Sequence, residues 1–114
     1  MDIFYAIADP TRRTIIEMLS KKGRLSATDI SDTFSVSPPA ISQHLKVLRE
    51  AHVVSVEKQG QQRIYQLNVE KIYEFERWAY EMTKVWNKRF DTLDAVLKKE
   101  KKKLLKINNK KYGK

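Results

Sequence analysis

The sequence predicts a mainly α-helical domain with one small β-hairpin and a long C-terminal helix. Two of its three prolines directly follow aspartate or serine, a pattern typical of helix starts. Two runs rich in β-branched and aromatic residues flank Gly60, which is typical of a hairpin. No glycine or proline occurs between Gln61 and Tyr112, so a single helix can occupy much of the last third of the chain.

Length and composition exclude several classes of protein. The chain has 114 residues, which is room for one domain. It has no cysteine, which excludes disulfides, thiol redox sensing and zinc-thiolate sites. No apolar run approaches the roughly 20 residues that cross a bilayer, and the N-terminus lacks a signal-peptide pattern. We therefore expect a cytoplasmic protein that has no membrane partner.

The net charge of +9 is concentrated at the C-terminus. Residues 98–114 hold nine lysines and one acid, so this segment carries +8 and the rest of the chain only +1. Asn108, Asn109 and Gly113 argue against a packed helix there. We expect a domain over residues 1–97 and a lysine-rich disordered tail over 98–114. The tail is either a solvated end or a supplementary non-specific contact with DNA.

Three short helices are expected in the first third of the chain. The first is a short apolar segment next to the N-terminus. The second begins at Pro10 with Asp9 as its N-cap and ends at Gly23. The third follows Ser26, which together with Asp29 resembles a capping box.

A fourth helix is expected over residues 38–51, after a tight polar connection. Ile41, Leu45 and Leu48 have the spacing i, i+4, i+7 and share its buried face. The opposite face carries small polar and basic side chains. From residue 35 to residue 49 there is no acid at all, which is unusual for an ordinary solvated helix face.

The segments 53–57 and 63–67 are expected to form the hairpin, and Asn68 to begin a last helix that reaches about Leu97. A helix of that length spans about 45 Å, too long for one small domain to cover. Its apolar stripe is broader than a two-helix seam requires, so we expect it to serve both its own domain and a second subunit, with help from Phe4. The stripe consists of Ile72, Phe75, Ala79, Met82, Trp86, Phe90, Leu93 and Leu97.

Short helices, a tight turn, a fourth helix and a hairpin follow the order of a winged helix-turn-helix. In that arrangement the fourth helix enters the major groove of DNA. Gln43 can pair bidentately with adenine, Ser42 can donate or accept, and Pro39 offers an apolar contact to a thymine methyl. The alternative is a solvated polar helix face, against which the absence of acids argues.

Candidate DNA contacts lie on the fourth helix and on the hairpin. Lys46 and Arg49 are suited to phosphates, and the hairpin cations to a phosphate or minor-groove contact, although an ordinary exposed turn would look similar. His44 borders the buried face, so it either touches a phosphate or only packs. The full set is Ser37, Pro38, Pro39, Ser42, Gln43, His44, Lys46, Arg49, Lys58, Gln61 and Arg63.

Metal binding and catalysis find little support in the sequence. His44 and His52 have no acidic cluster beside them, and His52 is expected to be structural. The serines are explained as helix caps, and neither a glycine-rich phosphate loop nor a nucleophile elbow is present. We expect no metal, cofactor or catalytic residue. The aromatic stripe of the last helix favours a dimer contact over a ligand site.

Two segments resemble the ArsR/SmtB-like winged-helix repressors. Residues 6–13, read as Ala-Ile-Ala-Asp-Pro-Thr-Arg-Arg, are similar to the opening signature of that family, and residues 37–51 to its recognition helix. The hairpin with Gly60, Arg63 and Tyr65 is similar as well. The resemblance implies a homodimeric transcriptional repressor that binds a palindromic operator in double-stranded DNA, with the DNA-contacting face starting at the proline pair of the fourth helix.

This sequence lacks the metal-site residues that the resemblance implies for metal-sensing members of the family. Metal-sensing members carry a cysteine pair in the third helix, or histidines and acids in the last, and neither is present here. The segment 86–93 resembles a metal-independent branch in which it extends the dimer helix. Two alternatives stay open: a regulator with a small-molecule inducer site in the dimer interface, and a winged-helix module that binds protein or RNA.

Overall fold

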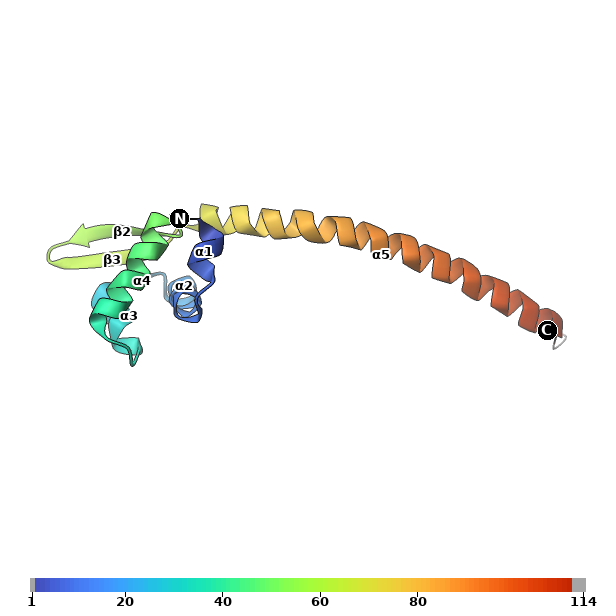
Figure 1. The fold of residues 1–114 in the computed structure, drawn as a ribbon, viewed down its shortest axis with the longest axis horizontal. Coiled ribbons are helices and arrows are strands. Elements are labelled where there is room, and N and C mark those ends of the chain that lie inside the picture. The colour runs from blue at the N-terminus through green and yellow to red at the C-terminus, as the bar shows by residue number, and fades with distance from the viewer. Residues whose placement is uncertain (1, 112–114) are drawn as a thin grey trace. The chain divides into compact units, whose positions relative to one another are not determined.

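A computed structural model describes residues 2–111, with the side chains of residues 2–105. Contacts divide the chain into two units, residues 1–75 and 76–114, each of which is described by itself. The mainly helical composition with a small antiparallel hairpin is as predicted. In chain order (Figure 1) the elements are α1 (Ile3–Ile7), α2 (Pro10–Lys22), β1 (Arg24–Ser26), α3 (Ala27–Thr33), α4 (Pro38–Glu50), β2 (Val54–Gln59), β3 (Gln62–Leu67) and α5 (Val69–Lys111).

The predicted helix starts are confirmed by their caps. The Asp9 carboxylate accepts a hydrogen bond from the backbone N–H of Arg12 (3.0 Å) at the start of α2. Ser26 and Asp29 form the reciprocal capping box of α3, at 3.0 and 3.3 Å. The Ser37 hydroxyl caps α4 by accepting from the backbone N–H of Ala40 (3.4 Å), and a proline follows it at the first helical position. Each cap satisfies backbone donors that the first turn of a helix leaves unpaired.

The hairpin belongs to a three-stranded antiparallel sheet with the order β1-β3-β2. Strand β1 is not predicted by the sequence, because its three residues are too few to show an alternating pattern. The expected strands 53–57 and 63–67 leave residues 58–62 as a linker, and this is wrong. The strands extend until only Gly60 and Gln61 remain between them. Gly60 has φ +62°, which glycine adopts without strain. Pairing therefore continues almost to the tip and stiffens it.

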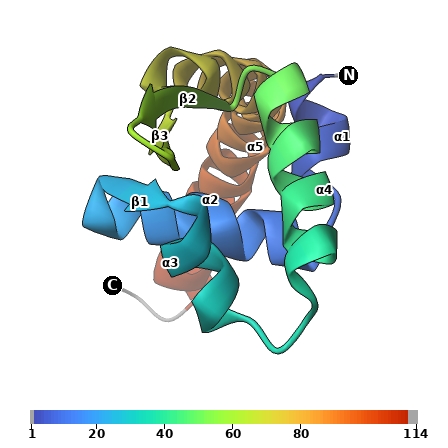
Figure 2. The ribbon, with the colours of Figure 1, turned by 90° about the vertical axis from the view of Figure 1, so that its left-hand side faces the viewer.

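The core of unit 1 holds α4 in place. Ile41, Leu45 and Leu48 are buried, as their spacing predicts. The helix packs against α1, α2, α3 and β2, and Figure 2 shows it alongside α1 with α3 below. Because one face of α4 is committed to the core, the face with Ser42 and Gln43 is held toward solvent.

The end of α4 has the hydrogen-bond pattern of a Schellman motif. The backbone N–H of His52 donates to the carbonyl of Arg49, and that of Val53 donates to the carbonyl of Leu48, both at 3.0 Å. Leu48 and Val53 are fully buried, which supplies the apolar contact typical of this motif. His52 has φ 59°, in the left-handed region where glycine is the usual residue. His52 is therefore the left-handed residue that ends α4, which is the structural role expected for it.

The last helix begins at Val69 as expected but continues to Lys111, so the expected end near Leu97 is wrong. The expected disordered tail, residues 98–114, is helical through Lys111, and residues 112–114 lie outside the described part of the chain. Leucine and lysine are good helix formers, and two asparagines do not outweigh a whole run of them.

Ion pairs one helical turn apart add to the stability of this segment. Lys98 lies 3.4 Å from the carboxylate of Asp94, and Lys103 lies 3.5 Å from that of Glu100. Pairs at these spacings each contribute a few tenths of a kcal/mol, about 0.2–0.5, to an exposed helix. The excess of lysine is thus compatible with a helix.

Candidate nucleic-acid interface

The outward face of α4 carries the predicted base-contacting residues. Pro39, Ser42, Gln43 and Lys46 are exposed, on the side opposite the buried positions. The hydroxyl of Ser37 is engaged as the cap of the helix, where it accepts from a backbone N–H at 3.4 Å. The start of α4 therefore presents two prolines and short polar side chains to solvent, which is the composition expected of a helix that enters a major groove.

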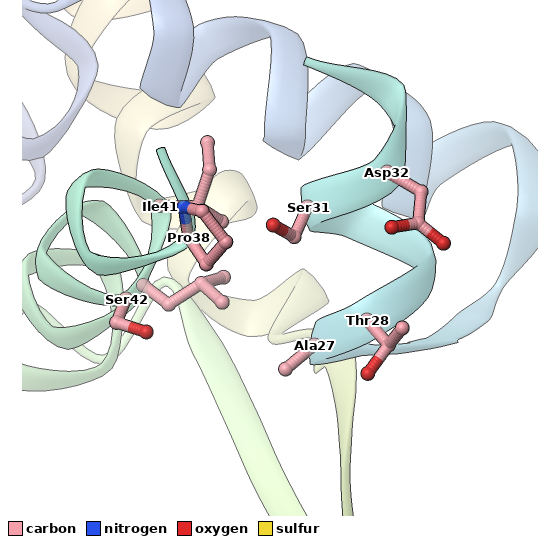
Figure 3. Close-up of a pocket in the computed structure, with 8 residues that line it drawn as sticks. Ala27, Thr28, Ser31, Asp32, Pro38, Ile41 and Ser42 are labelled. Atoms are coloured by element: carbon pink, nitrogen blue, oxygen red, sulfur yellow. The ribbon is translucent and has the colours of Figure 1, made fainter. Parts of the chain in front are cut away.

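One flank of this face borders a hollow of about 300 Å³ between α3 and α4 (Figure 3). Asp32 of α3 lines the same hollow as Pro38 and Ser42. Asp32 lies outside the acid-free segment 35–49 because it belongs to the preceding helix, yet the fold places it beside α4. Phosphate binding is unfavourable beside a carboxylate, so we expect phosphates to be bound further along α4, away from Asp32.

Further along the same side of α4 lies a second hollow of about 210 Å³, which residues of α4 and β3 line together with Ala27 of α3. Three cations line it: Lys46 and Arg49 from α4, and Arg63 from β3. Ser42 and Tyr65 complete its polar lining, and none of the described residues around it is an acid. Cations converging from two elements are suited to a phosphate, which they bind by charge and hydrogen bonds. The fold thus brings together cations that are up to 17 positions apart in the sequence.

The hairpin, or wing, carries two cations side by side. Lys58 and Arg63 are directly opposite in the β2–β3 register and exposed, and neither has an ion-pair partner within residues 2–105. The neighbouring Glu57 is paired instead with Arg24 of β1, at 2.8 Å. Gln61 lies exposed in the loop. Like charges opposite one another destabilise a hairpin, so this pair favours a role in binding over one in folding.

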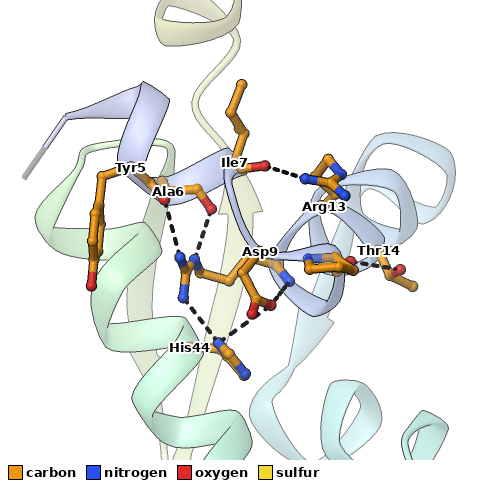
Figure 4. Close-up of polar contacts among 9 residues, drawn as sticks. Tyr5, Ala6, Ile7, Asp9, Arg13, Thr14 and His44 are labelled. Carbon is orange, nitrogen blue, oxygen red and sulfur yellow. Dashed lines mark hydrogen bonds and ion pairs between the residues drawn. The ribbon is translucent and has the colours of Figure 1, made fainter.

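His44 differs from its neighbours because its ring is half-buried and engaged. Its Nδ1 lies 3.3 Å from a guanidinium nitrogen of Arg12 and 3.9 Å from the carboxylate of Asp9 (Figure 4). The same guanidinium donates to the carbonyls of Ala6 (2.7 Å) and Tyr5 (3.0 Å). This cluster joins the end of α1 and the start of α2 to the middle of α4.

Arg12 is not among the functional residues predicted from the sequence. A signal was present: Arg12, Ile15 and Leu19 have the spacing i, i+3, i+7, and all three are buried. A charged residue in such a stripe is nearly always paired, because burial of an unpaired charge is costly. The pattern cannot show which groups it pairs with.

The electrostatics of the cluster also affect Asp9. The hydrogen bond from the backbone N–H of Arg12 holds the pKa of Asp9 below its ordinary value. The nearby charge of Arg12 acts in the same direction, as does that of His44 when its ring is protonated, while partial burial opposes them. Asp9 therefore stays ionised at the N-terminus of α2, where a negative charge is favourable.

The residues expected at a subunit interface divide into two groups. Phe4, Ile72 and Phe75 lie in unit 1, where Ile72 and Phe75 pack against its core and the ring of Phe4 lies 5.9 Å from that of Phe75. The others lie on α5 in unit 2, where Ala79 is half-buried. The rest are exposed and form one stripe that continues to Leu104: Met82, Trp86, Phe90, Leu93 and Leu97.

The described residues do not fit a metal site or a membrane span. Among residues 2–111, no group of three or more His, Asp or Glu side chains could hold a metal ion, and the chain has no cysteine. A metal site with thiolate ligands is therefore not available in this chain. No helix in the described part of the chain is long and apolar enough to cross a membrane.

Comparison with known proteins identifies the family. Residues 9–56 match the model of the bacterial regulatory protein family arsR. The chain is 42% identical over 77 residues to the transcriptional repressor SdpR of Bacillus subtilis strain 168, an alignment that covers 68% of this chain and 84% of SdpR. The chain belongs to the ArsR family. The predicted resemblance is thereby confirmed.

Other ArsR-family proteins extend the likeness. The arsenical resistance operon repressor of Escherichia coli K12 is 35% identical over 91 residues, which cover 75% of this chain and 77% of that one. The crystal structure of an ArsR family transcriptional regulator superposes with a TM-score of 0.69 at 28% identity, covering 75% of this chain and 87% of the other. The winged helix-turn-helix fold is confirmed, and this ArsR-family chain is a DNA-binding transcription regulator and not an enzyme.

Proposed function

We propose that this protein is a homodimeric transcriptional repressor that binds a palindromic operator through α4 and the wing. The observation that carries the proposal is the hollow between α4 and β3, which Lys46, Arg49 and Arg63 line together. In an ArsR-family domain, such a hollow next to an exposed helix face supplies phosphate binding beside base readout.

Each candidate residue has a role in this proposal. Ser42 and Gln43 contact base edges in the major groove, and Pro39 contacts a thymine methyl. The start of α4, with Ser37 and Pro38, approaches the phosphate backbone. The cations at positions 46, 49, 58 and 63 bind phosphates, and Gln61 at the wing tip reaches the adjacent groove.

The exposed stripe of α5 supports a second copy of the chain as its partner. Trp86 and Phe90 are 56% and 59% exposed, and their rings lie 6.1 Å apart on one face of the helix. A contiguous stripe of exposed aromatic and aliphatic side chains is typical of an interface with another molecule. Two-fold pairing buries the same stripe on both copies and presents two α4 helices to two half-sites about one DNA turn apart.

Two finer features complete the proposal. Because the chain lacks cysteine ligands, a thiophilic metal does not release the proposed repressor from its operator. Because a transcription regulator must reach chromosomal DNA, the protein works in the cytoplasm.

The deciding experiment selects bound fragments from the source genome in the presence of excess random duplex. We expect enrichment of a palindrome whose half-sites are about 10 base pairs apart. Binding of the selected fragment is then challenged with unrelated duplex and with single-stranded RNA. If the protein stays bound to the selected fragment in the presence of either competitor, the proposal is supported. Equal competition by RNA would favour the RNA-binding alternative, and recovery of no preferred fragment would contradict operator recognition.

A further inference from the structure

The contact between Arg12 and His44 determines which nitrogen of the histidine ring carries hydrogen. A guanidinium group has only donors, so the Nδ1 atom of His44 at 3.3 Å must accept. A neutral imidazole that accepts at Nδ1 carries its hydrogen on Nε2. The Asp9 carboxylate, 3.9 Å from Nδ1, and Arg12 are the charged groups that face this side of the ring.

The guanidinium of Arg12 is held in place by contacts that do not involve His44. Arg12 is 9% exposed, and two of its nitrogens donate to the carbonyls of Ala6 and Tyr5. Its guanidinium carbon also lies 5.3 Å from the centre of the Tyr5 ring. Arg12 is therefore a fixed donor, and the ring of His44 must orient to meet it.

The Nε2 atom of His44 remains accessible. In Figure 4 it lies on the side of the ring away from Asp9. Within residues 2–105 it has no hydrogen-bond partner, and no buried side-chain nitrogen or oxygen there lacks one. Nε2 must therefore face solvent, although the side chain is only 22% exposed.

The position of His44 on α4 places this donor beside the proposed DNA face. His44 follows Gln43 and lies about 100° around the helix from it. It lies about 160° around the helix from Ser42 and Lys46, so it is at the border between the Gln43 side of this face and the buried positions. The backbone phosphates that line a groove, and not the bases at its floor, are within reach of donors at the flank of an inserted helix.

We propose that Arg12 is a positioning residue that holds His44 in the Nε2–H tautomer, and that this Nε2–H donates to an operator phosphate at the edge of the α4 face. The inference rests on the proposed function and adds to it. His44 then binds a phosphate as a neutral donor, and a residue buried between α1 and α2 sets its direction.

Two variants of His44 separate this role from packing. His44→Gln places an amide near the position of Nε2, whereas His44→Asn places one near Nδ1, and neither adds a charge. We expect His44→Gln to bind the selected operator within about twofold of wild type. We expect His44→Asn to bind about tenfold more weakly, since a hydrogen bond to a charged group contributes at least about that factor.

The tautomer is measured directly on the free protein by ¹⁵N NMR of the His44 ring near pH 8. The inference predicts an unprotonated Nδ1 and a protonated Nε2. Arg12→Lys, checked for folding by circular dichroism, removes the fixed donor. The Arg12→Lys substitution should shift the His44 ring toward a mixture of tautomers. In this background, His44→Asn should lower operator affinity much less than it does in wild type.

The outcomes distinguish this inference from the proposed function. If wild type binds no duplex selectively, the proposed function fails. If wild type binds its operator but His44→Gln and His44→Asn bind equally well, the phosphate contact is wrong. If free wild type carries the ring hydrogen on Nδ1, the positioning role of Arg12 is wrong. Should Arg12→Lys fail to fold, the wild-type tautomer and the His44 pair still decide.

Discussion

The side-chain amide of Asn68 donates a hydrogen bond to the main-chain carbonyl of His52 (Nδ2–O, 2.8 Å). The backbone N–H of Asn68 also donates to the carbonyl of the next residue, Val53, at 2.8 Å. These two bonds join the residue before α5 to the turn that ends α4. They hold His52 in its left-handed conformation from outside the turn, while the Schellman bonds hold it from within.

His52→Gly is expected to raise the free energy of unfolding by about 0.5 kcal/mol. A side chain in the left-handed region costs about 1 kcal/mol or more, and the added freedom of glycine in the unfolded chain offsets part of the gain. Urea unfolding at constant m measures the change. His52→Ala, which keeps the strained Cβ, serves as the control and should bring no gain. A glycine variant less stable than wild type would contradict the strain argument.

Asp9→Ala is expected to destabilise the fold by about 1 kcal/mol at pH 7, the usual cost of losing an N-cap. Asp9→Asn keeps the capping oxygen and loses only the charge, so it should cost less. Since the folded-state pKa of Asp9 is lowered, its charge adds stability above its ordinary pKa of about 3.9, and this is lost as the pH falls further. The gap between wild type and Asp9→Asn should therefore narrow from pH 7 to pH 3. A gap that widens on acidification would show the sign to be wrong.

Gln43→Ala is expected to cost about 1–3 kcal/mol of operator affinity at one base position while random duplex binds nearly as before. Arg63→Ala and Lys58→Ala should instead weaken all sequences alike and lower the salt slope by about 1 each. Titrations of operator and random duplex at several salt concentrations test both expectations. Equal losses on the two duplexes for Gln43→Ala would refute its role in base readout.

Trp86→Glu combined with Phe90→Glu is expected to give monomers that bind operator poorly, because two charges then lie in the apolar stripe of α5. Thr92→Glu combined with Ala95→Glu adds the same charges on other sides of the same helix and should leave the dimer intact. Sedimentation at micromolar concentration distinguishes the two. A wild-type protein that sediments as a folded monomer and still binds its operator tightly would disprove the dimer.

Deletion of the residues after Leu97 removes nine lysines and one acid. We expect non-specific affinity to fall most at low salt, because the attraction of a lysine-rich segment to DNA is screened by ions. Operator preference and dimer formation should persist, since Met82 to Leu97 of the stripe remain. Gel-shift titrations of the truncated protein at low and physiological salt check this. Loss of operator preference would mean that this segment contributes to readout.

Helix starts, the buried face of α4 and the hairpin were all predictable from the sequence. These features depend on residues within about one turn of each other, such as Ser26 with Asp29 or Ser37 before Pro38, and local hydrogen bonds stabilise them. The end of α5 was not predictable in the same way. Many small helix propensities add up along residues 98–111, and no single residue signals the outcome.

What the sequence by itself determined is therefore the family, the order of the elements and the side chains that α4 presents to solvent. Only the tertiary structure decided which of these side chains lie close to one another. Arg63 joins Lys46 and Arg49 in one hollow because β3 and α4 both pack against α3, and Asp32 borders the same face because it lies on α3. Contacts such as that between Arg12 and His44, 32 positions apart, depend on the packing of helices against a shared core, which no short stretch of sequence encodes.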